Sequence, residues 1–145
     1  MVGERQAYRQ RRRAREFEAF AAGVAGRLMH TASLLTGEPA GHCPHAERLL
    51  TAALARTYAE WDRLRGEDPY NRAREELVGL FARAGWRHRR RQGGLLEPLT
   101  PGERLILVLR LYEGIAEEQT AALVGIPVGR VQTICTRAIS TMYAS

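Results

Sequence analysis

The sequence predicts an all-α protein built from two small helical lobes. Apolar residues recur at helical spacing along most of the chain, no alternating strand pattern is present, and a glycine-containing stretch at residues 92–94 divides the two helical parts. We therefore expect four segments in order: a basic, disordered arm (1–15), a three-helix lobe (16–91), a short linker (92–99) and a helix-turn-helix lobe (100–145).

Composition and charge narrow the functional class. The chain has 145 residues, 45% of them hydrophobic, and no apolar run of membrane-spanning length, so we expect a cytoplasmic protein. Its two cysteines, Cys43 and Cys135, do not form a disulfide framework. All 22 basic residues are arginine, for a net charge of +6. Residues 1–95 hold 18 arginines against 11 acids, and residues 96–145 hold 4 against 5. Attraction to a polyanion therefore lies mostly in the N-terminal part.

The N-terminal lobe is expected to contain three helices. Residues 1–15 carry six arginines without an apolar face, so the first helix is placed from about Glu16 to Leu35, with a break at residues 36–41. The second helix is placed at residues 44–65 and stops at Gly66. Asp68 and Pro69 are a suitable N-cap and first residue for the third helix, which ends in an aromatic and basic run.

The C-terminal lobe should begin with a capping box. Thr100 is placed at the N-cap, Pro101 at the first helical position and Glu103 two residues later. The helix over residues 101–112 is apolar almost all round, so it should be central to its lobe. Gly114 ends this helix.

The following residues have the spacing of a helix-turn-helix. Ala121 is small enough for a second helix to cross over it, and Gly125 can take the left-handed conformation of a tight turn. Val131 fills the angle between the helices, and Pro127 starts the second one. This spacing predicts a recognition helix over the end of the chain.

The two faces of that helix differ in chemistry. Its buried face comprises Val131, Ile134, Cys135, Ala138 and Met142, whereas its exposed face carries Arg130, Gln132, Thr133, Thr136 and Arg137. No acid follows Glu118. Arginine, glutamine and threonine suit phosphate oxygens and base edges in the major groove, so double-stranded DNA is the expected ligand. The alternative is a helical hairpin that binds nothing.

Three other groups have both a functional and a structural interpretation. His42, Cys43 and His45 could bind a metal, but no second cluster completes the set, so a polar loop capping the second helix is favoured and no cofactor is expected. Tyr58 and Trp61 could form a partner surface, although their helical spacing favours the core.

The end of the third helix is the last of these groups. Trp86, Arg87, Arg89, Arg90 and Arg91 could be a solvated helix end, but an aromatic beside arginines favours phosphate binding. The sequence has no phosphate loop and no paired carboxylate with a nearby histidine, so we do not expect an enzyme.

In this order of elements the chain resembles the extracytoplasmic-function group of bacterial sigma-70 factors, most closely a short actinobacterial subgroup. The residues that carry the resemblance lie in three segments: 16–20 with 34–37, 52–63, and 99–138. The resemblance covers roughly residues 16–143, and the last segment is the most specific.

The resemblance implies that the first lobe binds RNA polymerase core and −10 DNA, and that the recognition helix reads the −35 element of a promoter. It places Arg130, Gln132, Thr133, Thr136 and Arg137 on −35 DNA, and Trp86, Arg87, Arg89, Arg90 and Arg91 near −10 DNA. It places Glu47, Arg48, Thr51 and Tyr58 toward polymerase. It also implies a possible anti-sigma factor or other regulatory protein as a partner.

Two departures from the family pattern leave a second function open. Where the family has an acidic residue followed by Leu-Val-Gln, this chain has Arg48-Leu49-Leu50-Thr51, which reverses a charge that meets polymerase. The linker is also shorter, which limits the separation of the lobes. The chain is therefore expected to be a sigma factor, or else a sigma-like regulator or protein-interaction module that no longer initiates transcription.

Overall fold

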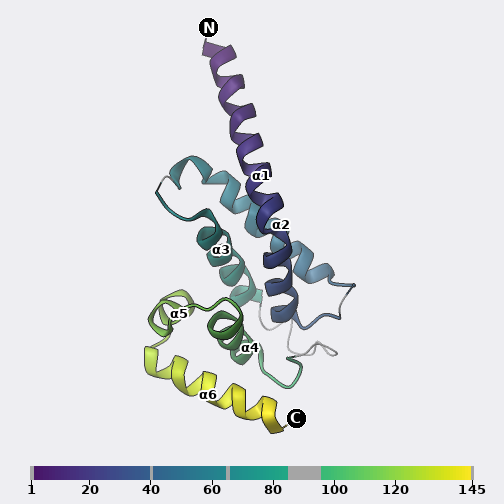
Figure 1. Cartoon of the computed structure of the whole chain (residues 1–145), viewed down its shortest axis with the longest axis vertical. Coiled ribbons are helices and arrows are strands. Elements are labelled where there is room, and N and C mark those ends of the chain that lie inside the picture. The colour runs from purple at the N-terminus through teal and green to yellow at the C-terminus, as the bar shows by residue number, and fades with distance from the viewer. Residues whose placement is uncertain (1, 40, 65, 85–95, 145) are drawn as a thin grey trace.

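The computed structural model describes residues 2–39, 41–64, 66–84 and 96–144, and these ranges contain helices and turns without a strand (Figure 1). The all-α prediction is confirmed. The elements in chain order are α1 (Val2–Thr36), α2 (Pro44–Ala59), the 3-10 turn η1 (Trp61–Arg63), α3 (Pro69–Ala84), α4 (Pro101–Leu107), the π-helical turn η3 (Val108–Tyr112), α5 (Glu117–Val124) and α6 (Val128–Ala144).

The first helix is longer than the sequence predicted. It begins at Val2, so residues 2–15 are helical and the prediction of a disordered arm is wrong. The arm is rich in arginine, glutamine and alanine, which are good helix formers. The packed helix that follows also supplies the costly nucleus, so the arm only has to extend it. Figure 1 shows this end of α1 projecting away from the other helices.

Helices α1, α2 and α3 form the N-terminal lobe around an apolar core, whose buried residues include Leu28, Ala32, Ala46, Ala53, Ala73 and Leu77. Alanine at several of these positions lets the helices approach closely. Helix α2 ends at Ala59 rather than near residue 65, because the chain turns into η1 and buries Leu64 after it.

The loop before α2 is organised by Glu38. Its carboxylate accepts hydrogen bonds from the backbone N–H of His45 (3.0 Å) and of Ala46 (2.9 Å). Burial would raise the pKa of Glu38, but these hydrogen bonds to the charged form outweigh it and hold the pKa below its usual range. The favoured interpretation, a polar loop that caps the second helix, is confirmed.

The C-terminal lobe is built around α4 and η3. The capping box is present: Thr100 Oγ1 accepts from the backbone N–H of Glu103 (3.2 Å), and the Glu103 carboxylate accepts from the backbone N–H of Thr100 (3.0 Å). The α4–η3 segment is central to its lobe, as predicted, but Leu111 is 63% exposed. A π-helical turn holds more residues than an α-helical turn, which shifts the apolar pattern and turns this side chain outward.

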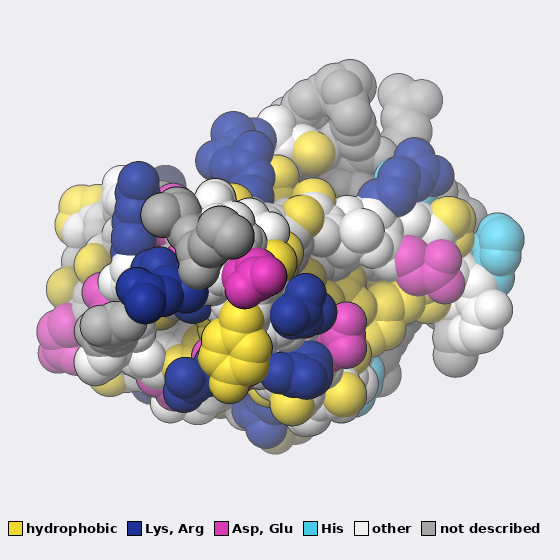
Figure 2. All heavy atoms as spheres, turned by 90° about the horizontal axis from the view of Figure 1, so that it is seen from above, with side chains coloured by type: hydrophobic (Ala, Val, Ile, Leu, Met, Phe, Trp, Pro, Cys, Tyr) yellow, Lys and Arg dark blue, Asp and Glu magenta, His cyan; other side chains and the backbone are white. Residues whose placement is uncertain are grey.

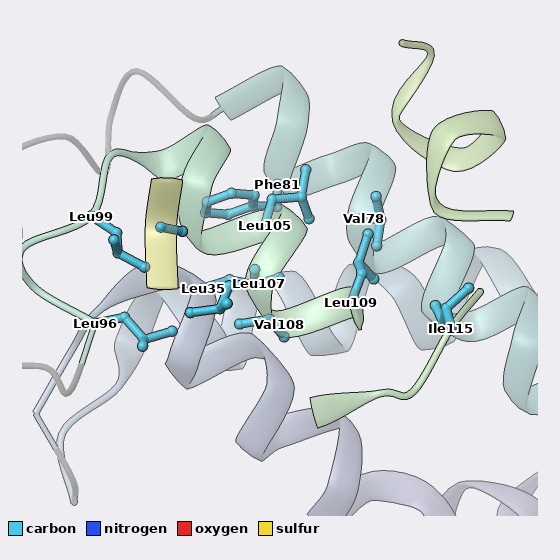
Figure 3. Packing of buried hydrophobic residues seen from close by; sticks show 11 residues of the cluster. Leu35, Val78, Phe81, Leu96, Leu99, Leu105, Leu107, Val108, Leu109 and Ile115 are labelled. Atoms are coloured by element: carbon cyan, nitrogen blue, oxygen red, sulfur yellow. The ribbon is translucent and has the colours of Figure 1, made fainter. Parts of the chain in front are cut away.

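The two lobes share one hydrophobic core. Leu35 of α1 and Phe81 of α3 pack in the same cluster as Leu105 and Leu109 of the C-terminal lobe (Figure 3). Leu96 and Leu99, from the turn before α4, belong to it too, and they are only 8% and 4% exposed. The second half of the predicted linker is thus a turn anchored in the core by two leucines, and residues 92–95 lie outside the described residues.

Candidate nucleic-acid interface

The helix-turn-helix has the predicted geometry. Gly125 ends α5 in the left-handed conformation, with φ 80° and ψ 35°. Its backbone N–H and that of Ile126 both donate to the carbonyl of Ala121, at 2.8 Å and 3.1 Å. Ala121 and Val131 pack together with Ile106 of α4 in a cluster in which Val131 is fully buried. The angle between α5 and α6 is thus fixed by a left-handed turn and a small apolar core.

This packing leaves one face of α6 in solvent. All five predicted DNA-contacting residues are exposed: Arg130, Gln132, Thr133, Thr136 and Arg137. The last four of them line one shallow hollow on the surface. On the opposite face, Val131 and Ala138 are fully buried, and Cys135 packs between two apolar clusters. The structure therefore brings the predicted residues onto a single surface.

The polar side chains on this surface differ in the hydrogen bonds that they already form. Among the described residues, neither Arg130 nor Arg137 forms a side-chain hydrogen bond or an ion pair. Gln132 donates to the Glu117 carboxylate of α5 (2.6 Å), and the Thr133 hydroxyl donates to the Gly129 carbonyl (3.0 Å). The two guanidinium groups are therefore available to a ligand, whereas the Gln132 amide must first leave Glu117.

The residues predicted to face polymerase lie on α2. Glu47, Arg48 and Thr51 are exposed and line a shallow hollow together with Pro44, Ala52 and Ala55. Tyr58 does not line this hollow. Its ring centroid lies 4.8 Å from that of Phe17, and the Arg13 guanidinium lies over it. Tyr58 is therefore half-buried against α1 and lies outside the core clusters of the described residues, and its assignment to the polymerase-facing group stays a prediction.

Two other predicted groups are placed differently. Trp86, Arg87, Arg89, Arg90 and Arg91 lie outside the described residues. In the loop before α2, His45 Nδ1 lies 3.1 Å from Glu38, and the Cys43 thiol donates to the Pro39 carbonyl (3.2 Å). Within the described ranges, no three His, Cys, Asp or Glu side chains are arranged to hold a metal ion.

A buried carboxylate between the lobes was missed by the sequence reasoning. Glu113 follows η3 in the C-terminal lobe, and its side chain is completely buried. It accepts hydrogen bonds from Thr31 of α1 (2.6 Å) and from Tyr70 of α3 (2.9 Å to each oxygen). Arg74 of α3 adds an ion pair at 3.0 Å. One carboxylate of the C-terminal lobe is thus held by two helices of the N-terminal lobe.

The charge state of this group follows from its surroundings. Burial would raise the pKa of Glu113, but the hydrogen bonds from Thr31, Arg74 and Tyr70 hold it below the usual range. Burial and the neighbouring Glu113 carboxylate raise the pKa of Tyr70 to about 12, so its hydroxyl stays protonated and donates. The only sequence signal was Arg74 itself, a charged residue adjoining the apolar stripe of the third helix.

Comparisons with known proteins agree with this architecture. Residues 95–144 match the family described as "Sigma-70, region 4", which covers the helix-turn-helix lobe. The chain is 24% identical over 152 residues to an RNA polymerase sigma-E factor of Streptomyces coelicolor, covering 88% of this chain and 84% of that protein. It is 27% identical over 156 residues to an RNA polymerase sigma-E factor of Streptomyces avermitilis, covering 88% and 83%.

The helical fold and the exposed face of α6 define a DNA-binding protein of the helix-turn-helix class. Its helix-turn-helix lobe carries the match to sigma-70 region 4, and the whole chain is similar to the two Streptomyces sigma-E factors. None of the helices in the described ranges is both long and apolar enough to cross a membrane.

Proposed function

We propose that this protein directs transcription initiation by binding promoter DNA through α6 and RNA polymerase core through α2. The exposed face of α6 carries the proposal. It presents five polar or cationic side chains and no acid on a helix-turn-helix that matches sigma-70 region 4. In such motifs the N-terminal part of the second helix reaches base edges in the major groove.

The three residue types on this face of α6 suit different contacts. Arg130 and Arg137 can donate two parallel hydrogen bonds to guanine or can pair with phosphate. Gln132 can bind an adenine edge, and the methyl groups of Thr133 and Thr136 can contact thymine. Glu117 holds the Gln132 amide in the free protein. Gln132 must therefore break this hydrogen bond before it can bind a base.

The first prediction tests this surface. Arg130→Ala and Arg137→Ala should each weaken binding to a duplex selected from a random library by about 1–3 kcal/mol if the contact is to a base edge. The fold should be unaffected, since both side chains are exposed. Fluorescence anisotropy measures the affinity, and Arg56→Ala is the control because Arg56 is exposed on α2, remote in sequence from both α6 and the N-terminal arginines. Unchanged affinity in a folded double variant would remove α6 from the DNA.

A second candidate function is a sigma-like regulator that binds DNA without initiating transcription. Two observations favour it. Arg48 sits in the hollow on α2 where the family pattern has an acid, which opposes the charge expected of a polymerase-binding surface. The lobes are also docked through a shared core and the Glu113 network, whereas the family reads two separate promoter elements. An anti-sigma or other regulatory protein is a further partner that this class of protein can take.

A further inference from the structure

We infer that residues 3–15 of α1, the described part of the basic arm, form a phosphate-binding surface that grips duplex DNA away from the site read by α6. The inference rests on the proposed promoter binding and adds a second DNA contact to it. The arm contains six arginines and a single acid, Glu4. Figure 2, seen from the N-terminal end of the molecule, shows dark-blue arginine side chains distributed over this face, with magenta carboxylates between them.

Four of the six arginines are uncommitted. Arg5, Arg9, Arg11 and Arg15 are exposed and, among the described residues, form neither an ion pair nor a hydrogen bond. The other two are engaged. Arg12 pairs with Glu16 (3.0 Å), and Arg13 donates to the Tyr58 carbonyl and lies 3.5 Å from Asp62. The guanidinium groups of these four arginines can therefore bind an anion.

The base of the arm is fixed in direction. The Arg13 guanidinium lies 4.4 Å from the centroid of the Tyr58 ring. Phe17 packs at 4.8 Å from Tyr58 and at 5.3 Å from Trp61, in ring-centroid distances. These contacts join α1 to α2 and η1, so the arm is held out in one direction rather than attached by a flexible tether (Figure 1).

A polar hollow lies between the arm and η1. The donors that line it are Gln6, Arg9 and Gln10. The remaining lining residues are two arginine–acid pairs: Arg12 with Glu16, and Arg13 with Asp62. Both acids are already paired with Arg12 and Arg13. Arg9 and the two amides are thus the groups that can donate to phosphate oxygens, and arginine matches phosphate geometry with two parallel hydrogen bonds.

Like charges within the arm weaken its helix when no anion is bound. Arg5 and Arg9, Arg9 and Arg13, and Arg11 and Arg15 are each four residues apart on the helix, a spacing at which like charges repel. Arg5, close to the N-terminus of α1, also opposes the helix dipole. A phosphate backbone, which carries a charge every ~1.7 Å along the duplex, relieves both costs at once.

Charge and position favour DNA as this anion. The helix-turn-helix lobe has only 4 arginines against 5 acids, so it adds little long-range attraction of its own. The arm and α6 lie at opposite ends of the long axis of the molecule (Figure 1). Phosphates bound by the arm therefore belong to a different stretch of the duplex from the one that α6 reads.

The test replaces Arg5, Arg9, Arg11 and Arg15 together by Gln in the full chain. Glutamine keeps the helix propensity and removes only the charge. The matched control replaces the same four residues by Lys, which keeps the charge. Affinity is measured by anisotropy as a function of salt, for a selected duplex and for a shuffled duplex, and circular dichroism checks the helix content.

For the Gln variant we expect weaker binding to both duplexes alike. The slope of log affinity against log salt should flatten by about 0.9 per lost contact, or about 3.6 for four contacts. The gain in affinity between 200 and 50 mM salt then shrinks by about 150-fold relative to the unaltered chain. The Lys variant should keep most of the slope.

Three results would overturn the inference, and they differ in what else they affect. An unchanged slope and affinity in the Gln variant would show that the arm does not touch DNA, with promoter binding by α6 intact. Loss of preference for the selected duplex at an unchanged slope would show that the arginines read bases instead of phosphates. If the unaltered chain binds neither duplex, the proposed function fails and this inference fails with it.

Discussion

Arg48 is a residue at which this chain departs from the pattern of the family it resembles. It is exposed at the edge of the α2 hollow, next to Glu47 and Thr51, and no described residue pairs with it. Its charge is therefore presented directly to any partner that docks on α2. Because rim charges change association rates and partner choice more than they change the fold, the effect should appear in polymerase binding.

We predict weak binding of the unaltered chain to RNA polymerase core and tighter binding after Arg48→Asp combined with Thr51→Gln. Both positions are exposed, so the stability change should stay within about 0.5 kcal/mol for each substitution. An anisotropy titration with labelled chain measures it, and Arg63→Asp is the control because it makes the same charge change on η1. Tight binding by the unaltered chain would show that Arg48 is tolerated. Binding by neither form would favour the sigma-like regulator.

At the scale of elements, the turn between α5 and α6 depends on Gly125. Its φ of +80° is in the left-handed region, although an added Cβ would meet no atom within 4 Å. Any cost of a side chain there is therefore conformational rather than steric. The turn sets the direction of α6, so a change here reorients the DNA-binding face without changing its residues.

Gly125→Ala should lower the free energy of unfolding by about 1–2 kcal/mol, because alanine is strained in this conformation. Gly23→Ala is the matched control. It lies inside α1 with open space around it, so it should stabilise by about 0.5–1 kcal/mol. Urea denaturation measures both. If the two substitutions had the same sign, the left-handed turn would not be the reason for Gly125.

The elements that could be predicted are those with a local signal. The capping box at Thr100 and the turn at Gly125 depend on neighbouring residues, and both are present as predicted. The helical arm was not predicted, because arginine-rich sequence lacks the apolar periodicity that marks a packed helix, whereas this one only extends another. In the Glu113 network, Arg74 and Thr31 lie 39 and 82 positions before Glu113 in the sequence. No spacing pattern reveals contacts between residues so far apart.

For the whole molecule, the main feature is the junction between the lobes. Its apolar part joins Leu35 and Phe81 to the α4–η3 segment, and its polar part is centred on Glu113. Arg27 adds to the polar part by donating to the Tyr112 carbonyl (3.2 Å) and to the Tyr70 hydroxyl (3.0 Å). A protein that contacts two promoter elements would have to loosen this junction, which makes its strength a functional quantity.

Glu113→Ala should destabilise the docked form by about 3–5 kcal/mol, since it leaves the buried Arg74 with its hydrogen bond to Asn71 but without a carboxylate partner. Small-angle scattering reports separation of the lobes, and urea denaturation reports the stability. Glu118→Ala is the control, because Glu118 is exposed on α5 and unpaired among the described residues. A docked Glu113→Ala variant of normal stability would show that the apolar core alone joins the lobes.

The pH dependence gives a second readout of the same junction. Folding lowers the pKa of Glu113. Its contribution to the free energy of unfolding is therefore present above the unfolded pKa of about 4.3 and is lost as pH falls through the folded pKa. Glu38 shifts in the same direction and adds its own acid sensitivity. Glu113→Gln should therefore be less stable at neutral pH and lose less stability on acidification. An acid transition identical in both forms would contradict this role of Glu113.

Run-off transcription with purified RNA polymerase core tests the proposed function most directly. On a template that carries the selected duplex upstream, we predict a transcript of one defined length only when the chain is added to core. The transcript should disappear with Arg130→Ala and Arg137→Ala combined and should increase with Arg48→Asp and Thr51→Gln combined. No transcript from either Arg48 form, at concentrations that saturate both DNA and core, would contradict initiation and leave a sigma-like regulator that binds DNA.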